Sequence, residues 1–139
     1  MALLHISDIE AAINHWRRIQ PSTDGITLPA EQHALAELYA QMVLQRQTQV
    51  DESALAPAAQ DAFVAWYNTT PDTPCIAICS TSQGDDVCKG CGRRFEEVQH
   101  WPAMTVGEKR AVWRRIHKDA SAWRFNRYAE RAAENRSTP

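Results

Sequence analysis

The sequence predicts a mainly α-helical protein, with a small N-terminal helical bundle, then a loop-rich four-cysteine metal knuckle, a short helix and a long C-terminal helix. Three observations lead to this prediction. Apolar residues repeat at spacings of three and four over several stretches, no stretch alternates convincingly as a strand would, and all four cysteines of the 139-residue chain lie between positions 75 and 91.

The first helix is predicted from a start signal and a stop signal. Ser7 can cap the helix while Glu10, three residues later, reaches back to the cap, and Ile6 precedes them as a hydrophobic staple. Pro21 and Gly25 end the pattern. The apolar stripe between these signals comprises Ile9, Ala12, Ile13, Trp16 and Ile19.

Two further helices complete the predicted bundle. One begins near Pro29, a residue suited to the first helical turn, and continues to about Gln47. The next runs from about Ser53 to Tyr67, with Pro57 tolerated in its first turn. Their apolar faces comprise Leu35, Leu38, Tyr39, Met42 and Val43 in the former, and Leu55, Ala59, Ala62, Phe63 and Trp66 in the latter.

A connector divides the chain into two predicted modules. Residues 69–74 contain two prolines and no large apolar side chain, which is typical of an extended linker. We therefore predict a helical module of unknown function over residues 1–68, a cysteine-containing module over 75–134 and a frayed tail over 135–139.

Two helices are predicted after the cysteines. Phe95, Val98 and Trp101 indicate a short helix that Pro102 stops. Residues 105–108 repeat the capping-box pattern, and the longest helix is expected from Val106 to about Ala133. Its apolar stripe comprises Val112, Trp113, Ile116, Ala120 and Trp123.

Composition and charge exclude some classes of protein. The chain is 44% hydrophobic with a net charge of −2, which does not indicate a binder of polyanions. The charge is divided unevenly, at −6 for residues 1–74 and +4 for residues 75–139. No apolar run approaches the roughly 18 residues of a membrane span, and the first residues lack a secretory signal. We expect a cytoplasmic protein without a membrane partner.

The cysteines predict a metal site. Cys75, Cys79, Cys88 and Cys91 form an even, tightly clustered set, which in a reducing cytosol favours metal ligation over disulfides. Gly90 and Gly92 would permit positive φ angles and expose N–H groups toward the sulfurs. Four thiolates suit zinc or an iron–sulfur cluster, and the spacing alone does not choose between them.

Other interpretations of the cysteines remain open. They could be free thiols, or Cys88 and Cys91 could form a redox pair, although the βαβ pattern that usually carries such a pair is absent. His100 is close enough in sequence to replace or supplement a ligand.

Residues 73–117 resemble a known family. The resemblance rests on the segment from Pro74 to Cys79, on the Cys-Lys-Gly-Cys-Gly-Arg run that starts at Cys88, and on Trp101 with the helix start near Glu108. In these features this part of the chain is similar to the YdhL-like family of short bacterial proteins. That family is predicted to bind iron–sulfur, so the resemblance implies a cluster. Arg94 stands where the family pattern has threonine, which leaves the ligands intact. Residues 5–67 resemble a second bacterial domain of unknown function, which implies a bacterial, two-part protein.

The last predicted helix carries a basic face. Opposite its apolar stripe lie Arg110, Arg114, Lys118 and, nearer the edge, Arg124. Mixing of basic and aromatic residues is typical of proteins that bind single-stranded nucleic acid, although the face could also be merely solvated.

The sequence therefore favours a non-enzymatic, metal-binding accessory protein. We find no nucleophile with a base, no paired carboxylates on one face and no phosphate-binding glycine loop. In this hypothesis an iron–sulfur or zinc centre organises the fold and presents a surface to a protein partner. The alternatives are iron–sulfur electron transfer or redox sensing, and nucleic-acid binding through the basic helix.

Overall fold

The computed structural model describes residues 2–125, which divide between two compact units. Within these residues, the first unit comprises residues 2–72 and 105–111, and the second comprises residues 73–104 and 112–125. The last helix, α5 (Val106–Asp119), contributes its first residues to the first unit and the rest to the second. The mainly α fold class is confirmed, with five α-helices among the described residues.

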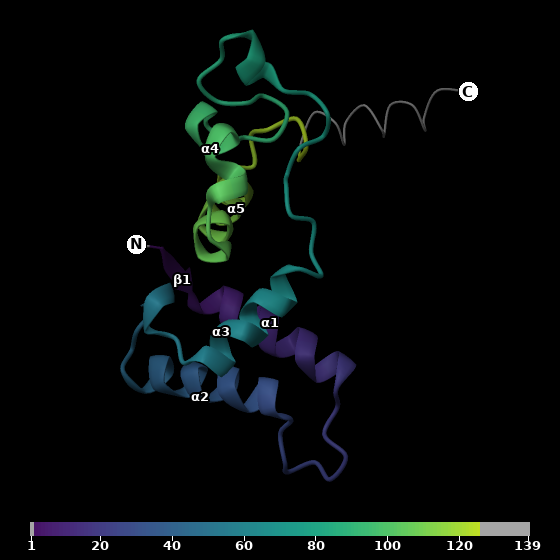
Figure 1. Cartoon of the computed structure of the whole chain (residues 1–139), viewed down its shortest axis with the longest axis vertical. Coiled ribbons are helices and arrows are strands. Elements are labelled where there is room, and N and C mark those ends of the chain that lie inside the picture. The colour runs from purple at the N-terminus through teal and green to yellow at the C-terminus, as the bar shows by residue number, and fades with distance from the viewer. Residues whose placement is uncertain (1, 126–139) are drawn as a thin grey trace, which may run out of the picture. The chain divides into compact units, whose positions relative to one another are not determined.

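Three helices form the first unit, as the sequence predicts. They are α1 (Ile6–Ile19), α2 (Ala30–Leu44) and α3 (Pro57–Tyr67), and each packs against the other two (Figure 1). The core of this unit contains Leu4, Ile9, Ala12, Leu35, Met42, Leu55, Ala59, Ala62, Phe63, Trp66 and Tyr67.

The first unit also contains two strands that the sequence analysis did not predict. Strand β1 (Leu3–His5) pairs antiparallel with β2 (Gln49–Asp51), and Leu4 lies opposite Val50. Each strand has three residues, which is too short for an alternating pattern to be recognised.

Helix boundaries differ from the prediction where local capping decides them. Helix α1 begins at Ile6, with His5 rather than Ser7 as its cap, because the His5 ring accepts the Ser7 N–H at 3.1 Å. Helix α2 stops at Leu44, before the expected end near Gln47, because Arg46 adopts a positive φ of 55° and turns the chain. Helix α3 starts at Pro57, preceded by the 3₁₀ turn η1 (Glu52–Ala54).

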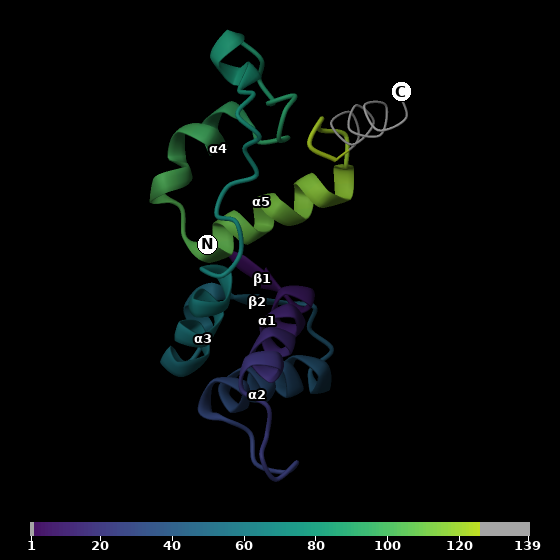
Figure 2. The same ribbon diagram turned by 90° about the vertical axis from the view of Figure 1, so that its right-hand side faces the viewer.

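The second unit is rich in loops before its helices. The turn η2 (Ser80–Gln83) follows the first cysteine pair. Helix α4 (Phe95–His100), labelled in Figure 2, leads into the turn η3 (Trp101–Ala103). The predicted short helix ending near Pro102 is thereby confirmed. The buried residues include Trp101, Val112, Trp113, Ile116 and Ala122, together with Cys88 and Cys91.

The predicted extent of the last helix is wrong within the described residues. Helix α5 starts with the expected capping box, in which Thr105 N–H and Glu108 Oε1 lie 3.2 Å apart, but it ends at Asp119. Ala120 takes a positive φ of 48° and redirects the chain, although no glycine or proline marks this position. The remainder of the expected helix, residues 126–133, lies outside the described residues.

No helix in the described part of the chain combines the length and apolar character that a membrane crossing needs.

Candidate metal centre

The turn that carries Cys88 and Cys91 is closed by backbone hydrogen bonds. Gly92 N–H donates to Cys88 O at 2.8 Å, and Cys88 N–H donates to Arg93 O at 2.8 Å. Gly92 has a positive φ of 89°, as the sequence analysis expected, and a Cβ there would lie 3.3 Å from Ile116. The backbone between the two cysteines is therefore folded into a tight knuckle.

Gly90 has a different role from the expected one. Its φ is not positive, so backbone freedom does not explain it. Instead, a Cβ at Gly90 would lie 2.5 Å from the Ile78 carbonyl oxygen and 3.3 Å from the Ile78 Cβ. The absence of a side chain lets the knuckle pack directly on the segment between Cys75 and Cys79, so the two cysteine pairs approach one another.

Each sulfur has a hydrogen-bonding group from the residue two positions later. Ala77 N–H donates to Cys75 Sγ at 3.3 Å, and the Thr81 hydroxyl oxygen lies 3.1 Å from Cys79 Sγ. The backbone N–H of Gly90 donates to Cys88 Sγ, and the backbone N–H of Arg93 donates to Cys91 Sγ. Hydrogen-bond donors directed at sulfur stabilise the thiolate relative to the thiol.

Burial and hydrogen bonding affect the two knuckle thiols differently. Burial alone would raise the pKa of Cys88, but N–H groups of Cys91, Ser80 and Gly90 outweigh it and hold that pKa below its usual value. Burial raises the pKa of Cys91, and Arg93 opposes this only in part. The two sulfurs also contact one another.

Arg93 is a site residue that the sequence analysis did not single out. Its side chain is 6% exposed, its Nε donates to Cys91 Sγ at 3.4 Å and its guanidinium carbon lies 4.8 Å from the centre of the Trp101 ring. No carboxylate pairs with it among the described residues. A buried cation needs a nearby negative charge, which a Cys91 thiolate would supply. Its sequence signals are its position two residues after a cysteine and its place at the end of the Cys-Lys-Gly-Cys-Gly-Arg run.

The four sulfurs do not meet at one point in this structure. Cys88 and Cys91 are buried, Cys75 and Cys79 are exposed, and no three His, Cys, Asp or Glu side chains in residues 2–125 are grouped closely enough to hold a metal ion. The donor set nonetheless fits a soft metal, because it supplies four thiols from two neighbouring segments of the chain. Cys75, Cys79, Cys88 and Cys91 are the residues that would hold it. The exposed His100 ring contacts Glu96 O at 2.8 Å on its own helix.

The four predicted basic contact residues do not form one free face. Arg110 pairs with Asp8, with Nη2 2.9 Å from Oδ1, and Arg124 Nη1 donates to Pro74 O at 2.8 Å. Arg114 is half-buried and Lys118 is exposed. The prediction that these residues contact nucleic acid or a partner stays a prediction.

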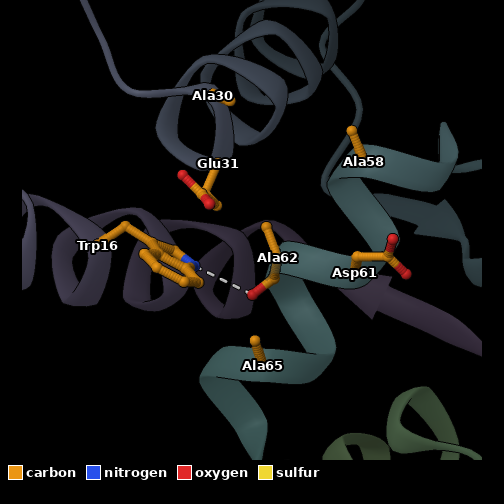
Figure 3. A pocket seen from close by; sticks show the side chains of 7 residues that line it. All are labelled: Trp16, Ala30, Glu31, Ala58, Asp61, Ala62 and Ala65. Atoms are coloured by element: carbon orange, nitrogen blue, oxygen red, sulfur yellow. Dashed lines mark hydrogen bonds between the residues drawn. The ribbon is translucent and has the colours of Figure 1, made fainter.

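A recess without cysteines lies among the helices of the first unit. It has a volume of about 340 Å³ and is lined by alanines, the Trp16 indole and two carboxylates, from Glu31 of α2 and Asp61 of α3 (Figure 3). Trp16 Nε1 donates to Ala62 O at 3.0 Å, which fixes the indole at the wall. The recess contains no nucleophile paired with a base, so its lining does not indicate catalysis.

Comparisons with known proteins match both parts of the chain separately. Residues 2–68 match the model of a family described as a protein of unknown function, DUF3717, and residues 73–120 match that of a second family of unknown function, DUF1289. No curated protein and no solved structure gives a match. The chain is therefore similar to one family over its N-terminal helices and to another over all four cysteines and α5.

Proposed function

We propose that Cys75, Cys79, Cys88 and Cys91 bind one metal centre, either zinc or an iron–sulfur cluster, in a non-enzymatic accessory protein. The observation that carries the proposal is the hydrogen bonding of the sulfurs. Every one of them has a hydrogen-bonding group from the residue two positions later, which is a backbone N–H of Ala77, Gly90 or Arg93, or the Thr81 hydroxyl. Unligated thiols have no need of such an arrangement, whereas thiolate ligands do.

The charge around the knuckle supports the same proposal. Four thiolates leave a net negative charge even after a divalent metal is bound, and N–H groups directed at sulfur offset that charge. The buried guanidinium of Arg93 beside Cys91 Sγ adds a full positive charge at the same place. Arg93 therefore acts on the ligand rather than on the metal.

One of the two cysteine pairs already lies on a closed turn, and metal binding would bring the other pair to it. Cys88 and Cys91 lie on the closed knuckle, whereas Cys75 and Cys79 flank Ala77, which has an unfavourable positive φ of 66°. We propose that this short segment adjusts to bring its sulfurs onto the metal. The loop between the ligand pairs buries few large side chains, so ligand bonds would supply much of the folding free energy of the cysteine-containing segment.

The two metal choices imply different roles. The resemblance of residues 73–117 to the YdhL-like family favours an iron–sulfur cluster, which would allow electron transfer or redox sensing. Zinc in the same ligands would be structural, because four thiolates leave no open coordination position. In either case we propose a protein partner as the target of the organised surface, and a reducing cytoplasm as the compartment, because the ligands must stay reduced.

Purification under anaerobic conditions, with metal analysis and an absorption spectrum, tests the proposal. We expect about one metal centre per chain, with iron, sulfide and visible absorption for a cluster, or colourless protein with one zinc. Replacing any single cysteine by serine should lower the metal content, whereas the control Gln83→Ala, in the loop between the pairs, should not. Full metal content in all four serine variants would contradict the four-cysteine site.

A further inference from the structure

We propose that residues 122–125, which follow α5, form a strap that joins the two cysteine-bearing segments, with Arg124 as the positioning residue. The inference rests on the proposed metal site. It assigns to Arg124 a role other than contact with nucleic acid, and it concerns only residues of the second unit.

The backbone of the strap is bonded to the knuckle. Trp123 N–H donates to Lys89 O at 2.8 Å, and Arg124 N–H donates to Gly90 O at 2.9 Å. Lys89 and Gly90 are the two residues between Cys88 and Cys91, so the strap fixes the part of the turn that sets the separation of these ligands. Ala122 packs behind the same turn, where a Cβ on Gly92 would lie 3.5 Å from the Ala122 Cβ.

The side chain of Arg124 reaches the other cysteine pair. Its Nη1 donates to the carbonyl oxygen of Pro74 at 2.8 Å. Pro74 is among the fully buried side chains and directly precedes Cys75. One residue thus bonds to the turn of the second pair through its backbone and to the entrance of the first pair through its guanidinium.

Aromatic rings hold the Arg124 side chain in place. Its guanidinium carbon lies 5.1 Å from the centre of the Trp113 ring and 5.7 Å from that of Phe125. Trp113 is buried on α5 and is stacked on His117, with ring centres 5.7 Å apart. A cation held over a fixed ring loses little further freedom when it bonds to Pro74, so the clamp is preorganised.

Two consequences follow for metal binding. Loss of the clamp should separate the ligand pairs and weaken metal binding by about 10–100-fold, as for other residues that orient ligands. By linkage, metal binding should also tighten the strap, because it restrains the same two segments. The amide hydrogens of Trp123 and Arg124 report this tightening directly.

The test compares three variants of the full chain: Arg124→Met, Arg124→Lys and the matched control Lys118→Met, which removes the same charge from an exposed position on α5. Zinc affinity is measured by competition with a chromophoric chelator, and the rate of zinc loss is measured from the loaded proteins. Hydrogen exchange at the Trp123 and Arg124 amides is followed with and without zinc.

We expect Arg124→Met to bind about 10–100-fold more weakly and to lose zinc faster, while Arg124→Lys, which keeps a donor and the charge, falls between it and the wild type. Zinc should slow exchange at both amides in the wild type and in Lys118→Met, and less so in Arg124→Met. If metal-free Arg124→Met does not fold, the rate of zinc loss from its loaded form shows whether Arg124 helps to hold the metal. Equal zinc affinity, equal rates of zinc loss and equal amide hydrogen exchange in Arg124→Met and Lys118→Met would contradict the role of the strap but not the proposed metal site. A wild type without cysteine-bound metal would overturn the proposed function and the strap with it.

Discussion

At the scale of single residues, the two glycines of the knuckle serve different purposes. Gly92 supplies a backbone conformation that other residues avoid, whereas Gly90 supplies space for the carbonyl oxygen of Ile78. Only the first purpose is visible in a sequence, because a cysteine–glycine pattern indicates a turn. The contact between Gly90 and Ile78 depends on a segment twelve residues earlier and needs the folded chain.

Gly90→Ala should push the segment between Cys75 and Cys79 away from the knuckle. The new Cβ would lie 2.5 Å from a backbone oxygen, which cannot move aside as a flexible side chain can. We expect metal affinity to fall by at least about tenfold, by analogy with other changes that misplace ligands. Gln83→Ala serves as the control, because Gln83 is exposed in the loop between the two cysteine pairs. Equal zinc affinity of the two variants would contradict the packing argument.

At the scale of elements, ion pairs attach α5 to other parts of each unit. In the first unit Asp8 of α1, whose side chain is 3% exposed, accepts two hydrogen bonds from Arg110, whose guanidinium lies 5.2 Å from the Trp66 ring centre. In the second unit Arg115 forms a two-point contact with Glu97 of α4, at 2.6 Å for each oxygen.

Arg110→Met should destabilise the protein, because it removes the guanidinium that pairs with the buried Asp8 carboxylate. Breaking a buried pair from one side typically costs about 3–5 kcal/mol of unfolding free energy. Denaturant unfolding of the full chain measures the change, and Lys118→Met is the matched control. The double variant with Asp8→Asn should lose less than the sum of the two single variants. Additive losses would show that the pair does not couple α1 to α5.

Acid should weaken the contact between α4 and α5 through Glu97. Burial would raise the pKa of this carboxyl, but hydrogen bonds from Arg115 and the Arg94 N–H outweigh it and hold the pKa below its usual 4.5. Because the folded-state pKa is lowered, the stabilisation is present above about pH 4.5 and is lost as the pH falls through the folded-state value. The difference in melting temperature between the wild type and Glu97→Gln should therefore shrink below pH 4.5. A difference that stays constant down to pH 3 would refute this role.

The elements show what the sequence could and could not predict. Helices α1 to α5 were predicted because each has an apolar stripe that repeats with the helical period, and the capping box of Thr105 and Glu108 formed as expected. The end of α5 was not predicted, because Ala120 adopts a left-handed conformation without a glycine signal. The contacts that follow this turn, from Trp123 and Arg124 to the knuckle, are tertiary and outweigh local helix propensity.

At the scale of the whole molecule, the first unit is built from two separate segments of the chain. Residues 105–111 follow the cysteines in the chain but pack with the first unit, where Glu52 accepts hydrogen bonds from the Thr105 hydroxyl at 2.7 Å and from the Gly107 N–H at 3.2 Å. Lys109 adds an ion pair with Asp72 at 2.9 Å. These contacts join residues between 37 and 55 positions apart in the sequence, so a boundary drawn from linker composition alone does not include them.

A fragment of residues 1–72 tests the importance of these contacts. We expect it to remain helical, because α1, α2 and α3 pack on one another, but to melt at a lower temperature than the full chain. Asp8→Asn should destabilise the full chain, where Arg110 loses its partner, and should have little effect on the fragment, where Arg110 is absent. Circular dichroism on the four proteins measures both effects. Equal destabilisation in fragment and full chain would show that Asp8 acts independently of α5.

X-ray absorption at the metal edge of the purified full chain counts the atoms bound to the metal, so it shows whether the four cysteines are its ligands. The account predicts four sulfur neighbours at about 2.3 Å, with an additional iron neighbour if the centre is a cluster. It also predicts that each cysteine-to-serine variant that retains metal shows fewer sulfur neighbours than the wild type. A first shell made mainly of nitrogen or oxygen, or a sulfur count that the serine variants leave unchanged, would contradict the account.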